Sequence, residues 1–181
     1  FAVVGLGISN LPLIDFLLAH GATVVARDRK SREELGDTAA RLEAAGVTLR
    51  LGEQYLDDLD ERVIFRSPGL RPDLPEFREA VRRGAVLTSE TELFLELTPA
   101  RVLGITGSDG KTTTTTLTAL FLQAEQELRG GTAKVFVGGN IGKPLLPHAE
   151  EMTADDFAVL ELSSFQLMDL RVSPWRAAVT N

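Results

Sequence analysis

The sequence contains no cysteine in 181 residues, so it can form neither disulfide bonds nor thiolate metal sites. No apolar run approaches the roughly 18 residues that a membrane-spanning helix needs, and no signal peptide opens the chain. Basic residues are in the minority, 19 against 26 acidic ones, and the net charge of −7 is opposite to that of most nucleic-acid-binding domains. We therefore expect a protein of the reducing cytoplasm that binds neither membranes nor nucleic acid.

Histidine is also scarce, with two residues, and no cluster of His, Asp and Glu has the spacing of a metal site. Nothing in the sequence suggests a Ser-His-Asp triad. Apolar residues make up 44% and charged residues 25%, which are ordinary proportions for a globular chain. An acidic chain of this kind can bind phosphates only through local devices, and several are present.

Short β-branched runs alternate with longer amphipathic stretches in the first half of the chain. The glycines at positions 21, 46 and 84 each stand where a helix is expected to stop. This alternation predicts the α/β class, with a parallel sheet covered by helices. The pattern predicts strands at residues 2–4, 23–26, 47–51, 63–65 and 85–87, and helices at 13–20, 32–45 and 75–83.

A second series of the same kind begins near residue 101. It predicts a helix at 113–126 and strands at 101–106, 133–137, 157–160 and 176–180. Residues 90–100, which end in Thr98-Pro99, are the expected junction between the two series. We therefore expect one domain over residues 1–97 and a second, incomplete one over residues 98–181.

A glycine-rich loop follows the first strand of the second series. Residues 106–112 read Thr-Gly-Ser-Asp-Gly-Lys-Thr between a strand and a helix, where backbone N–H groups and the helix N-terminus can hold phosphates. Lys111 would reach the β- and γ-phosphates, and Thr112 would ligate Mg²⁺. Ile105 stands where the Walker A pattern has glycine, so a plain glycine turn with a surface lysine remains the alternative.

Another turn, Gly5-Leu6-Gly7, lies between the first strand and the first helix, and Asp28 ends the second strand. This order is typical of dinucleotide-binding domains. The fingerprint fails at Asn10, where a third glycine would allow the helix to pack closely on the strand. A purely structural role for the turn therefore stays open.

Polar or glycine-rich segments also follow three other strands. Ser67-Pro68-Gly69 lies at the carboxyl edge of the first sheet, where ligands bind in open α/β folds, although an ordinary turn would look the same. Residues 138–142, Gly-Gly-Asn-Ile-Gly, suggest either close approach to a ligand or a tight turn. Glu161 ends a strand that reads as buried, where a carboxylate needs a metal or an ion-pair partner.

The segment 106–113 resembles the ATP loop of the Mur ligases, in which the missing Walker glycine is normal. Residues 139–142, Gly-Asn-Ile-Gly, and residues 161–167, Glu-Leu-Ser-Ser-Phe-Gln-Leu, are similar to the D-glutamate-adding members of that family. The alanine-adding ligases carry a different acidic motif at this strand end, and the ligases that add diaminopimelate or lysine read Ser-Ser-His. Folylpolyglutamate synthases share the loop but lack the N-terminal nucleotide domain. The resemblance covers essentially the whole chain.

The resemblance implies a Rossmann-like parallel-sheet domain that binds the uridine diphosphate of the substrate, not a dinucleotide. It is followed by the first part of a P-loop ATP-binding central domain. By resemblance, the residues near the uridine and its phosphates are Ile8, Ser9, Asp28 and Arg29, with further contacts from Ser67 and Gly69, and the muramoyl part meets Asn140 and Ser163. The residues that would bind ATP are Gly107, Ser108, Asp109, Gly110, Lys111, Thr112 and Thr113. Thr112 and Glu161 would ligate Mg²⁺, and Lys111 and Glu161 are the expected catalytic residues.

The activity implied by the resemblance is ATP- and Mg²⁺-dependent addition of D-glutamate to UDP-N-acetylmuramoyl-L-alanine, through an acyl phosphate, in peptidoglycan precursor synthesis. The family continues past Asn181 to a magnesium-binding histidine, a carbamylated lysine and a C-terminal domain. We therefore expect the full-length enzyme to be a cytoplasmic monomer and the 181-residue chain to be inactive alone. A nicotinamide-dependent oxidoreductase and a non-catalytic nucleotide switch are the competing hypotheses.

Overall fold

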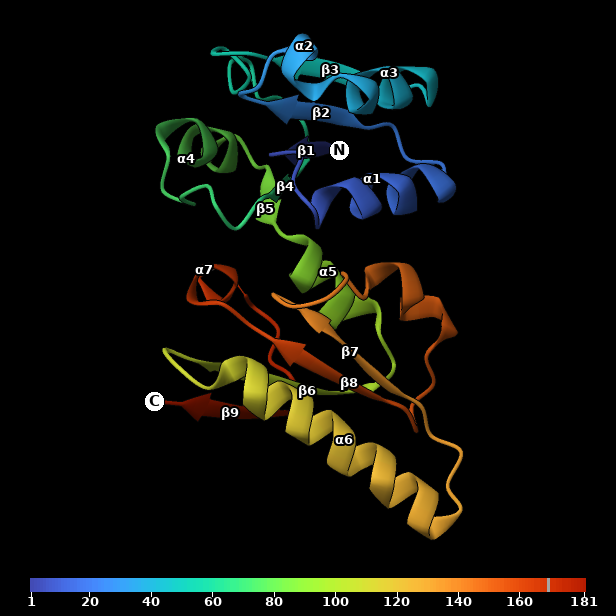
Figure 1. The fold of residues 1–181 in the computed structure, drawn as a ribbon. Helices are drawn as coiled ribbons and strands as arrows, with labels where there is room; N and C mark the ends of the chain where they lie inside the picture. Colours follow the sequence, from blue (N-terminus) through green and yellow to red (C-terminus); the bar gives the residue numbers. More distant parts are fainter. Residues whose placement is uncertain (169) are drawn as a thin grey trace. The chain divides into compact units, whose positions relative to one another are not determined.

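A computed structural model describes residues 1–168 and 170–181. The chain divides into two compact units, Phe1–Glu90 and Thr91–Asn181. Each unit is built on one parallel sheet with helices packed against it (Figure 1). The predicted α/β class, with two successive parallel sheets, is confirmed.

The first unit has a five-stranded sheet in the order β3-β2-β1-β4-β5, all parallel. The helices α1 and α3 lie on one side and α4 on the other (Figure 1), as right-handed crossovers require when the strand order reverses at β1. Its strands are β1 (Ala2–Val4), β2 (Val25–Asp28), β3 (Thr48–Leu51), β4 (Val63–Arg66) and β5 (Val86–Thr88). Its helices are α1 (Asn10–Ala19), α2 (Arg32–Leu35), α3 (Asp37–Ala44) and α4 (Pro75–Arg82).

The core of the first unit explains why β1 is an uninterrupted apolar run. All three of its residues are fully buried, because the central strand of a parallel sheet is covered on both faces. Phe77 of α4 is also fully buried, in a cluster that includes Val4 and Ile64. Truncating such a phenylalanine to alanine typically costs about 3–5 kcal/mol. This packing fixes the strand ends that carry the site described below.

The second unit has a four-stranded parallel sheet in the order β7-β8-β6-β9. The long helix α6 packs across β6, β7 and β8 (Figure 1), with Ala119 against Ile105 and Val159. The strands are β6 (Arg101–Gly107), β7 (Val135–Gly139), β8 (Phe157–Glu161) and β9 (Arg176–Thr180). The helices are α5 (Glu90–Leu97), α6 (Lys111–Arg129), the 3-10 helix η1 (Leu146–Glu151) and α7 (Ser164–Leu167).

Two segments differ from the sequence-based expectation. The helix expected over residues 32–45 is split at Gly36, whose φ of 49° is not helical. The expected junction at 90–100 contains α5, and the compact units divide after Glu90, not after residue 97. Glu92 of α5 is fully buried and pairs with Arg171 (Nε–Oε1 2.9 Å), which ties this helix to the second unit.

Candidate functional site

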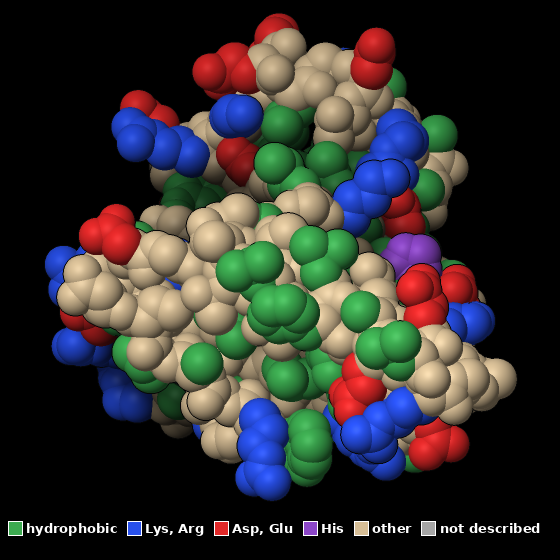
Figure 2. Space-filling view, turned by 60° about the horizontal axis from the view of Figure 1, so that its bottom comes forward, with side chains coloured by type: hydrophobic (Ala, Val, Ile, Leu, Met, Phe, Trp, Pro, Cys, Tyr) green, Lys and Arg blue, Asp and Glu red, His purple; other side chains and the backbone are tan. Residues whose placement is uncertain are grey.

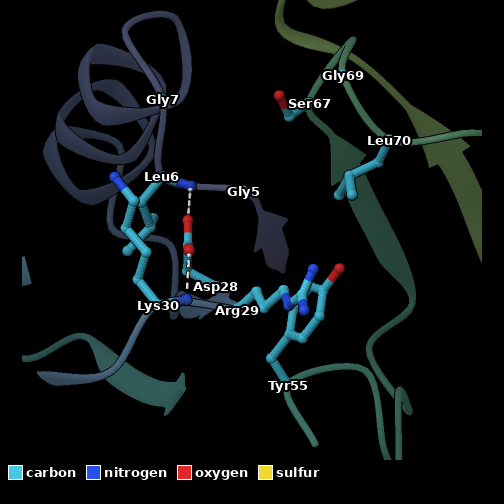
Figure 3. A pocket seen from close by; sticks show the side chains of 10 residues that line it. All are labelled: Gly5, Leu6, Gly7, Asp28, Arg29, Lys30, Tyr55, Ser67, Gly69 and Leu70. Atoms are coloured by element: carbon cyan, nitrogen blue, oxygen red, sulfur yellow. Dashed lines mark hydrogen bonds between the residues drawn. The ribbon is translucent and has the colours of Figure 1, made fainter. Parts of the chain in front are cut away.

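A pocket of about 290 Å³ lies at the carboxyl ends of β1, β2 and β4 in the first unit (Figure 3). In open α/β sheets this is where ligands bind, at the point where the strand order reverses. Of the residues predicted to contact the uridine end, Asp28, Arg29, Ser67 and Gly69 line this pocket. The pocket is also lined by Gly5, Leu6, Gly7, Lys30, Tyr55 and Leu70.

The other two residues predicted for this end directly follow Gly7 in the sequence but do not line the pocket themselves. The side chain of Ile8 is 81% exposed, and neither Ile8 nor Ser9 lines the pocket. Ser9 is the N-cap residue of α1, and its side chain makes no capping hydrogen bond. A second cavity, of about 640 Å³, shares Asp28, Arg29 and Lys30 with the pocket. Arg29 and Lys30, which line both cavities, supply local positive charge in an acidic chain.

The carboxylate of Asp28 holds the glycine turn in place. Its Oδ2 accepts a hydrogen bond from the backbone N–H of Leu6 (2.6 Å), and its Oδ1 accepts one from that of Lys30 (2.9 Å) (Figure 3). Hydrogen bonds from backbone amides to a carboxylate are among the stronger ones in proteins. Asp28 therefore links the end of β2 to the turn after β1.

The absence of the third fingerprint glycine has a structural explanation. Asn10 is buried at the start of α1, and its Nδ2 donates hydrogen bonds to the carbonyl oxygens of Gly5 (2.8 Å) and Val4 (3.2 Å). The asparagine side chain thus fastens the helix to the turn.

Gly5 cannot be replaced without strain. Its φ is +86°, and an added Cβ would lie 2.7 Å from the Cβ of Ser67. The backbone N–H of Ser67 donates to the carbonyl of Val4 (2.9 Å), so the two turns are held close together. The contact places the Gly5 turn beside Ser67, whose turn was expected at the carboxyl edge of the first sheet.

Tyr55 lines the pocket but was not predicted from the sequence. Burial raises the pKa of its phenol above the ordinary value, and the Asp28 carboxylate raises it further, so the hydroxyl stays a neutral hydrogen-bond donor. The buried Arg27 fixes this segment, because its guanidinium donates to the carbonyl of Tyr55 (3.0 Å) and pairs with Glu61 (3.0 Å). The sequence did contain an indication that Tyr55 belongs to the site, because it is the only tyrosine and follows a strand at the ligand-binding edge of the sheet.

In the second unit, a cavity of about 750 Å³ lies beside the loop after β6. Of the predicted ATP-binding residues, Gly107, Ser108 and Lys111 line it. The remaining four follow on the same loop and the first turn of α6 without lining the cavity: Asp109, Gly110, Thr112 and Thr113. Both residues predicted for the muramoyl part, Asn140 and Ser163, line the same cavity. The other residues around it are Thr106, Ser164, Phe165, Val179, Thr180 and Asn181.

Glu161 is the centre of the polar contacts at this site. It ends the buried strand β8 and is 2% exposed. Its Oε2 accepts a hydrogen bond from the Thr112 hydroxyl (2.7 Å), and its Oε1 accepts one from Nδ2 of Asn140 (2.9 Å). The structure therefore brings together Thr112, Asn140 and Glu161, which are far apart in sequence. In the described part of the chain, the hydrogen-bond partners of this buried carboxylate are a hydroxyl and an amide.

Lys111 curls back over its own loop. Its Nζ donates to the carbonyl oxygens of Gly107 (2.7 Å) and Ser108 (3.0 Å). The ammonium group thus lies at the phosphate loop, beside the cavity. A phosphate bound there would meet this charge without any change in the fold.

Ser163 is held by a capping box at the start of α7. Its hydroxyl accepts a hydrogen bond from the backbone N–H of Gln166 (3.3 Å) and donates one to Oε1 of the same residue (3.0 Å). Gln166 in turn donates through Nε2 to the hydroxyl of Thr91 (3.1 Å). Gln166 and Thr91 were not predicted as site residues, because their contact joins distant parts of the sequence.

The donor set at Glu161 fits a magnesium ion. Across residues 1–168 and 170–181 there is no group of three or more His, Cys, Asp or Glu side chains that could hold a metal. Thr112 and Glu161 offer one hydroxyl and one carboxylate oxygen. Mg²⁺ is commonly bound through one or two such protein ligands together with substrate phosphates and water.

No helix within residues 1–168 and 170–181 is both long and apolar enough to cross a membrane.

Comparison with known proteins assigns both units to one family. The family description "Mur ligase MurD-like, N-terminal domain" matches residues 1–89, and "Mur ligase middle domain" matches residues 105–181. The UDP-N-acetylmuramoylalanine–D-glutamate ligase of Clostridium botulinum (strain Kyoto / Type A2) is 54% identical over 181 residues, covering 99% of this chain and 38% of the relative. The protein of the same name from Clostridium kluyveri is 52% identical over 180 residues, with the same coverage of 99% and 38%.

A solved structure has a similar fold. The UDP-N-acetylmuramate-alanine ligase MurC from Thermotoga maritima matches with a TM-score of 0.50 at 24% identity, covering 99% of this chain and 40% of that one. This likeness concerns the fold alone. The chain spans 38% of the length of the clostridial relatives that it matches.

Proposed function

Because the chain belongs to the Mur ligase family, we propose that it is the part of a ligase that binds ATP and UDP-N-acetylmuramoyl-L-alanine for the addition of D-glutamate. The observation that carries this proposal is the group of Thr112, Asn140 and Glu161 beside a phosphate loop. A purely structural glycine turn would not need a strand-end carboxylate bound to the first threonine of the following helix. The clostridial relatives are named for this activity.

The pocket of the first unit is proposed to hold the uridine diphosphate end. Arg29 and Lys30 supply positive charge for the phosphates, and the Ser67 turn lies across the pocket from them. The Tyr55 ring offers an apolar face with a neutral hydroxyl, which suits a planar base. Asn10 favours uridine diphosphate over a dinucleotide as the ligand. It stands where the dinucleotide-binding fingerprint has its third glycine, and its side chain is hydrogen-bonded to the turn.

The cavity of the second unit is proposed to hold the ATP phosphates and the muramoyl-alanine end. Lys111 would neutralise the β- and γ-phosphates, as the lysine of a phosphate loop does. Thr112 and Glu161 would hold Mg²⁺, which when bound would balance charge on the transferred phosphate. Asn140 and Ser163 line the same cavity and would orient the acceptor.

The chemistry follows in two steps. A carboxylate oxygen of the lactoyl-alanine attacks the γ-phosphorus of ATP, giving an acyl phosphate and ADP. The amine of D-glutamate then attacks the acyl carbon, phosphate leaves, and the amine loses a proton. The contribution of this chain is positioning and charge neutralisation, with Lys111 as the main cation, so no protein nucleophile is needed. We place this activity in the cytoplasm and expect the full-length enzyme to be a monomer.

Titration calorimetry with the 181-residue chain tests this proposal. We expect it to bind UDP-N-acetylmuramoyl-L-alanine, to bind UDP more weakly, and to bind ATP only with Mg²⁺. Tight NADH binding without any Mg²⁺ requirement would instead support an oxidoreductase. ATP binding with no affinity for any uridine nucleotide would support a nucleotide switch and contradict the proposal.

A further inference from the structure

Four carbonyl oxygens of the phosphate loop accept hydrogen bonds from side-chain donors. Four consecutive residues, Thr106 to Asp109, take part. Lys111 Nζ donates to the carbonyls of the middle two, Gly107 (2.7 Å) and Ser108 (3.0 Å). The hydroxyl of Thr180, at the end of β9, lies 3.1 Å from the carbonyl oxygen of Thr106 and 2.5 Å from that of Asp109. A hydroxyl has one proton, so Thr180 donates to these two oxygens in turn or shares the proton between them.

The orientation of these carbonyls matters for anion binding. A phosphate loop binds oxyanions through its backbone N–H groups, and a carbonyl oxygen turned toward the phosphate would repel it. The Thr180 hydroxyl holds the carbonyls of Thr106 and Asp109. Because a peptide group is planar, fixing these two carbonyls also fixes the direction of the N–H groups of the residues that follow them, Gly107 and Gly110. Such preorganisation lowers the cost of ordering the loop when a ligand binds.

The two side-chain donors, Lys111 and Thr180, should respond differently when a nucleotide binds. The ammonium of Lys111 is the charge that the phosphates would attract, so its bonds to Gly107 and Ser108 compete with the ligand. Thr180 carries no charge and holds the two outer carbonyls, so its contact can persist with the ligand in place.

The end of β9 fits closely against the loop. The backbone N–H of Ser108 donates to the carbonyl of Asn181 (2.6 Å). Gly107 has a φ of +138°, and a Cβ there would collide with the backbone of Thr180. The preceding residues of β9, Arg176–Val179, are exposed, so Thr180 is the point at which this strand's side chains engage the loop.

We propose that Thr180 is a positioning residue for phosphate binding, whose hydroxyl keeps the loop in its anion-accepting conformation before ATP arrives. This inference rests on the proposed function, since it assumes that the loop binds ATP. It adds a residue to that site from a strand that carries none of the predicted site residues.

The test compares Thr180→Val, which keeps the shape and removes the hydroxyl, with Thr180→Ser, which keeps the hydroxyl. Calorimetry on the 181-residue chain would measure the Kd of ATP with Mg²⁺ and the Kd of UDP. We expect Thr180→Val to raise the Kd for ATP about tenfold, since one hydrogen bond is worth on the order of that factor. Thr180→Ser should stay within about threefold of the wild type. The Kd of UDP, whose proposed pocket lies in the first unit, should not change in either variant.

A matched control is Thr153→Val. The Thr153 hydroxyl donates to the buried Asp156 (3.0 Å) in the same unit, outside the loop. This variant should lower the Tm without weakening ATP binding, which separates a positioning role from a general loss of stability. If Thr180→Val fails to fold, Thr180→Ala serves in its place and should show the same loss of ATP affinity.

Wild-type ATP affinity in Thr180→Val or Thr180→Ala would overturn the inference. An equal loss in Thr180→Ser would also overturn it, because the hydroxyl would then not be the determinant. If the wild-type chain binds no ATP under any condition, the proposed function itself fails, and that result is distinguishable from the first two.

Discussion

The two candidate sites occupy similar positions on their sheets but are supported differently. The pocket of the first unit lies at a central strand, β1, with β2 on one side and β4 on the other. It is supported from within by buried side chains such as Asn10, Arg27 and Arg66, each at most 3% exposed. The phosphate loop of the second unit lies next to the edge strand β9 and depends on that strand's last residues. In the described residues, the first site is therefore supported by buried side chains, and the second combines the buried Glu161 with hydrogen bonds from Thr180.

The two units also differ in how many large apolar side chains they expose. The second unit exposes large apolar side chains along α6, of which Phe121 is 70% exposed and Leu128 is 88% exposed. Val179 on β9 is 80% exposed. Figure 2 shows hydrophobic side chains gathered near the middle of the forward face, with charged side chains around them. Exposed apolar side chains of this size are typical of surfaces that contact another surface.

The largest effect that separates the two sites should come from Lys111→Ala. In a full-length ligase carrying this chain, the change should lower the rate of ligation by a factor of ~10³ or more, about 4 kcal/mol, because a phosphate contact and its charge in the transition state are lost. Binding of the uridine substrate, measured by calorimetry, should stay nearly unchanged. Substantial residual turnover, or an equal loss of uridine-substrate affinity, would show that the role of Lys111 is wrongly assigned.

A smaller effect, confined to the first unit, is expected for Gly5→Ala. The positive φ and the contact with Ser67 should cost roughly 1–3 kcal/mol of stability and weaken uridine-substrate binding. The neighbouring Gly7→Ala is the matched control, because a Cβ at Gly7 meets nothing within 4 Å. Urea unfolding and calorimetry would measure both variants. If Gly5→Ala bound the uridine substrate as well as Gly7→Ala does, the close fit of the two turns would not matter for binding.

The smallest expected effect is the contribution of one buried carboxylate of the second unit, Asp156, to the pH dependence of stability. Burial by itself would raise the pKa of Asp156, but hydrogen bonds from the backbone N–H groups of Lys134 (2.6 Å) and Thr153 (2.8 Å) outweigh it, and the pKa is lowered. A carboxyl group with a lowered folded-state pKa stabilises the fold above its unfolded pKa of about 3.9, and this contribution is lost as the pH falls below that value.

Asp156→Asn should therefore destabilise the second unit by on the order of 1 kcal/mol at pH 7 and by less near pH 3. Thermal unfolding at the two pH values would measure the difference. Asp155→Asn is the control, because the Asp155 side chain is 88% exposed. A destabilisation by Asp156→Asn that is as large at pH 3 as at pH 7 would mean that its charge is not what matters.

The features predictable from the sequence are those set by local order along the chain. The loop at 106–112, the strand-end positions of Asp28 and Glu161, and the turn at Gly5 all follow from a strand, a short loop and the next element. Parallel strands place their carboxyl ends at one edge, so the meeting of Thr112 with Glu161 could also be expected.

The features that were missed depend on contacts between distant segments. Thr180 and Asp109 are 71 residues apart, and Gln166 and Thr91 are 75 apart. No local pattern indicates which hydroxyl meets which carbonyl. The helix α5 was taken for a junction because Thr98-Pro99 ends it, whereas its buried Glu92 shows that it packs as part of the second unit. Ile8, expected by resemblance near the uridine and its phosphates, stays a prediction, since its side chain is 81% exposed and does not line the pocket.

The central claim is that the chain holds two separate nucleotide sites, one on each sheet. Its most direct test is a titration of ATP and Mg²⁺ into the 181-residue chain, alone and then saturated with UDP-N-acetylmuramoyl-L-alanine. The account predicts one equivalent of each ligand bound at the same time, with neither displacing the other. Displacement of one ligand by the other would mean a single shared site, and would contradict the claim.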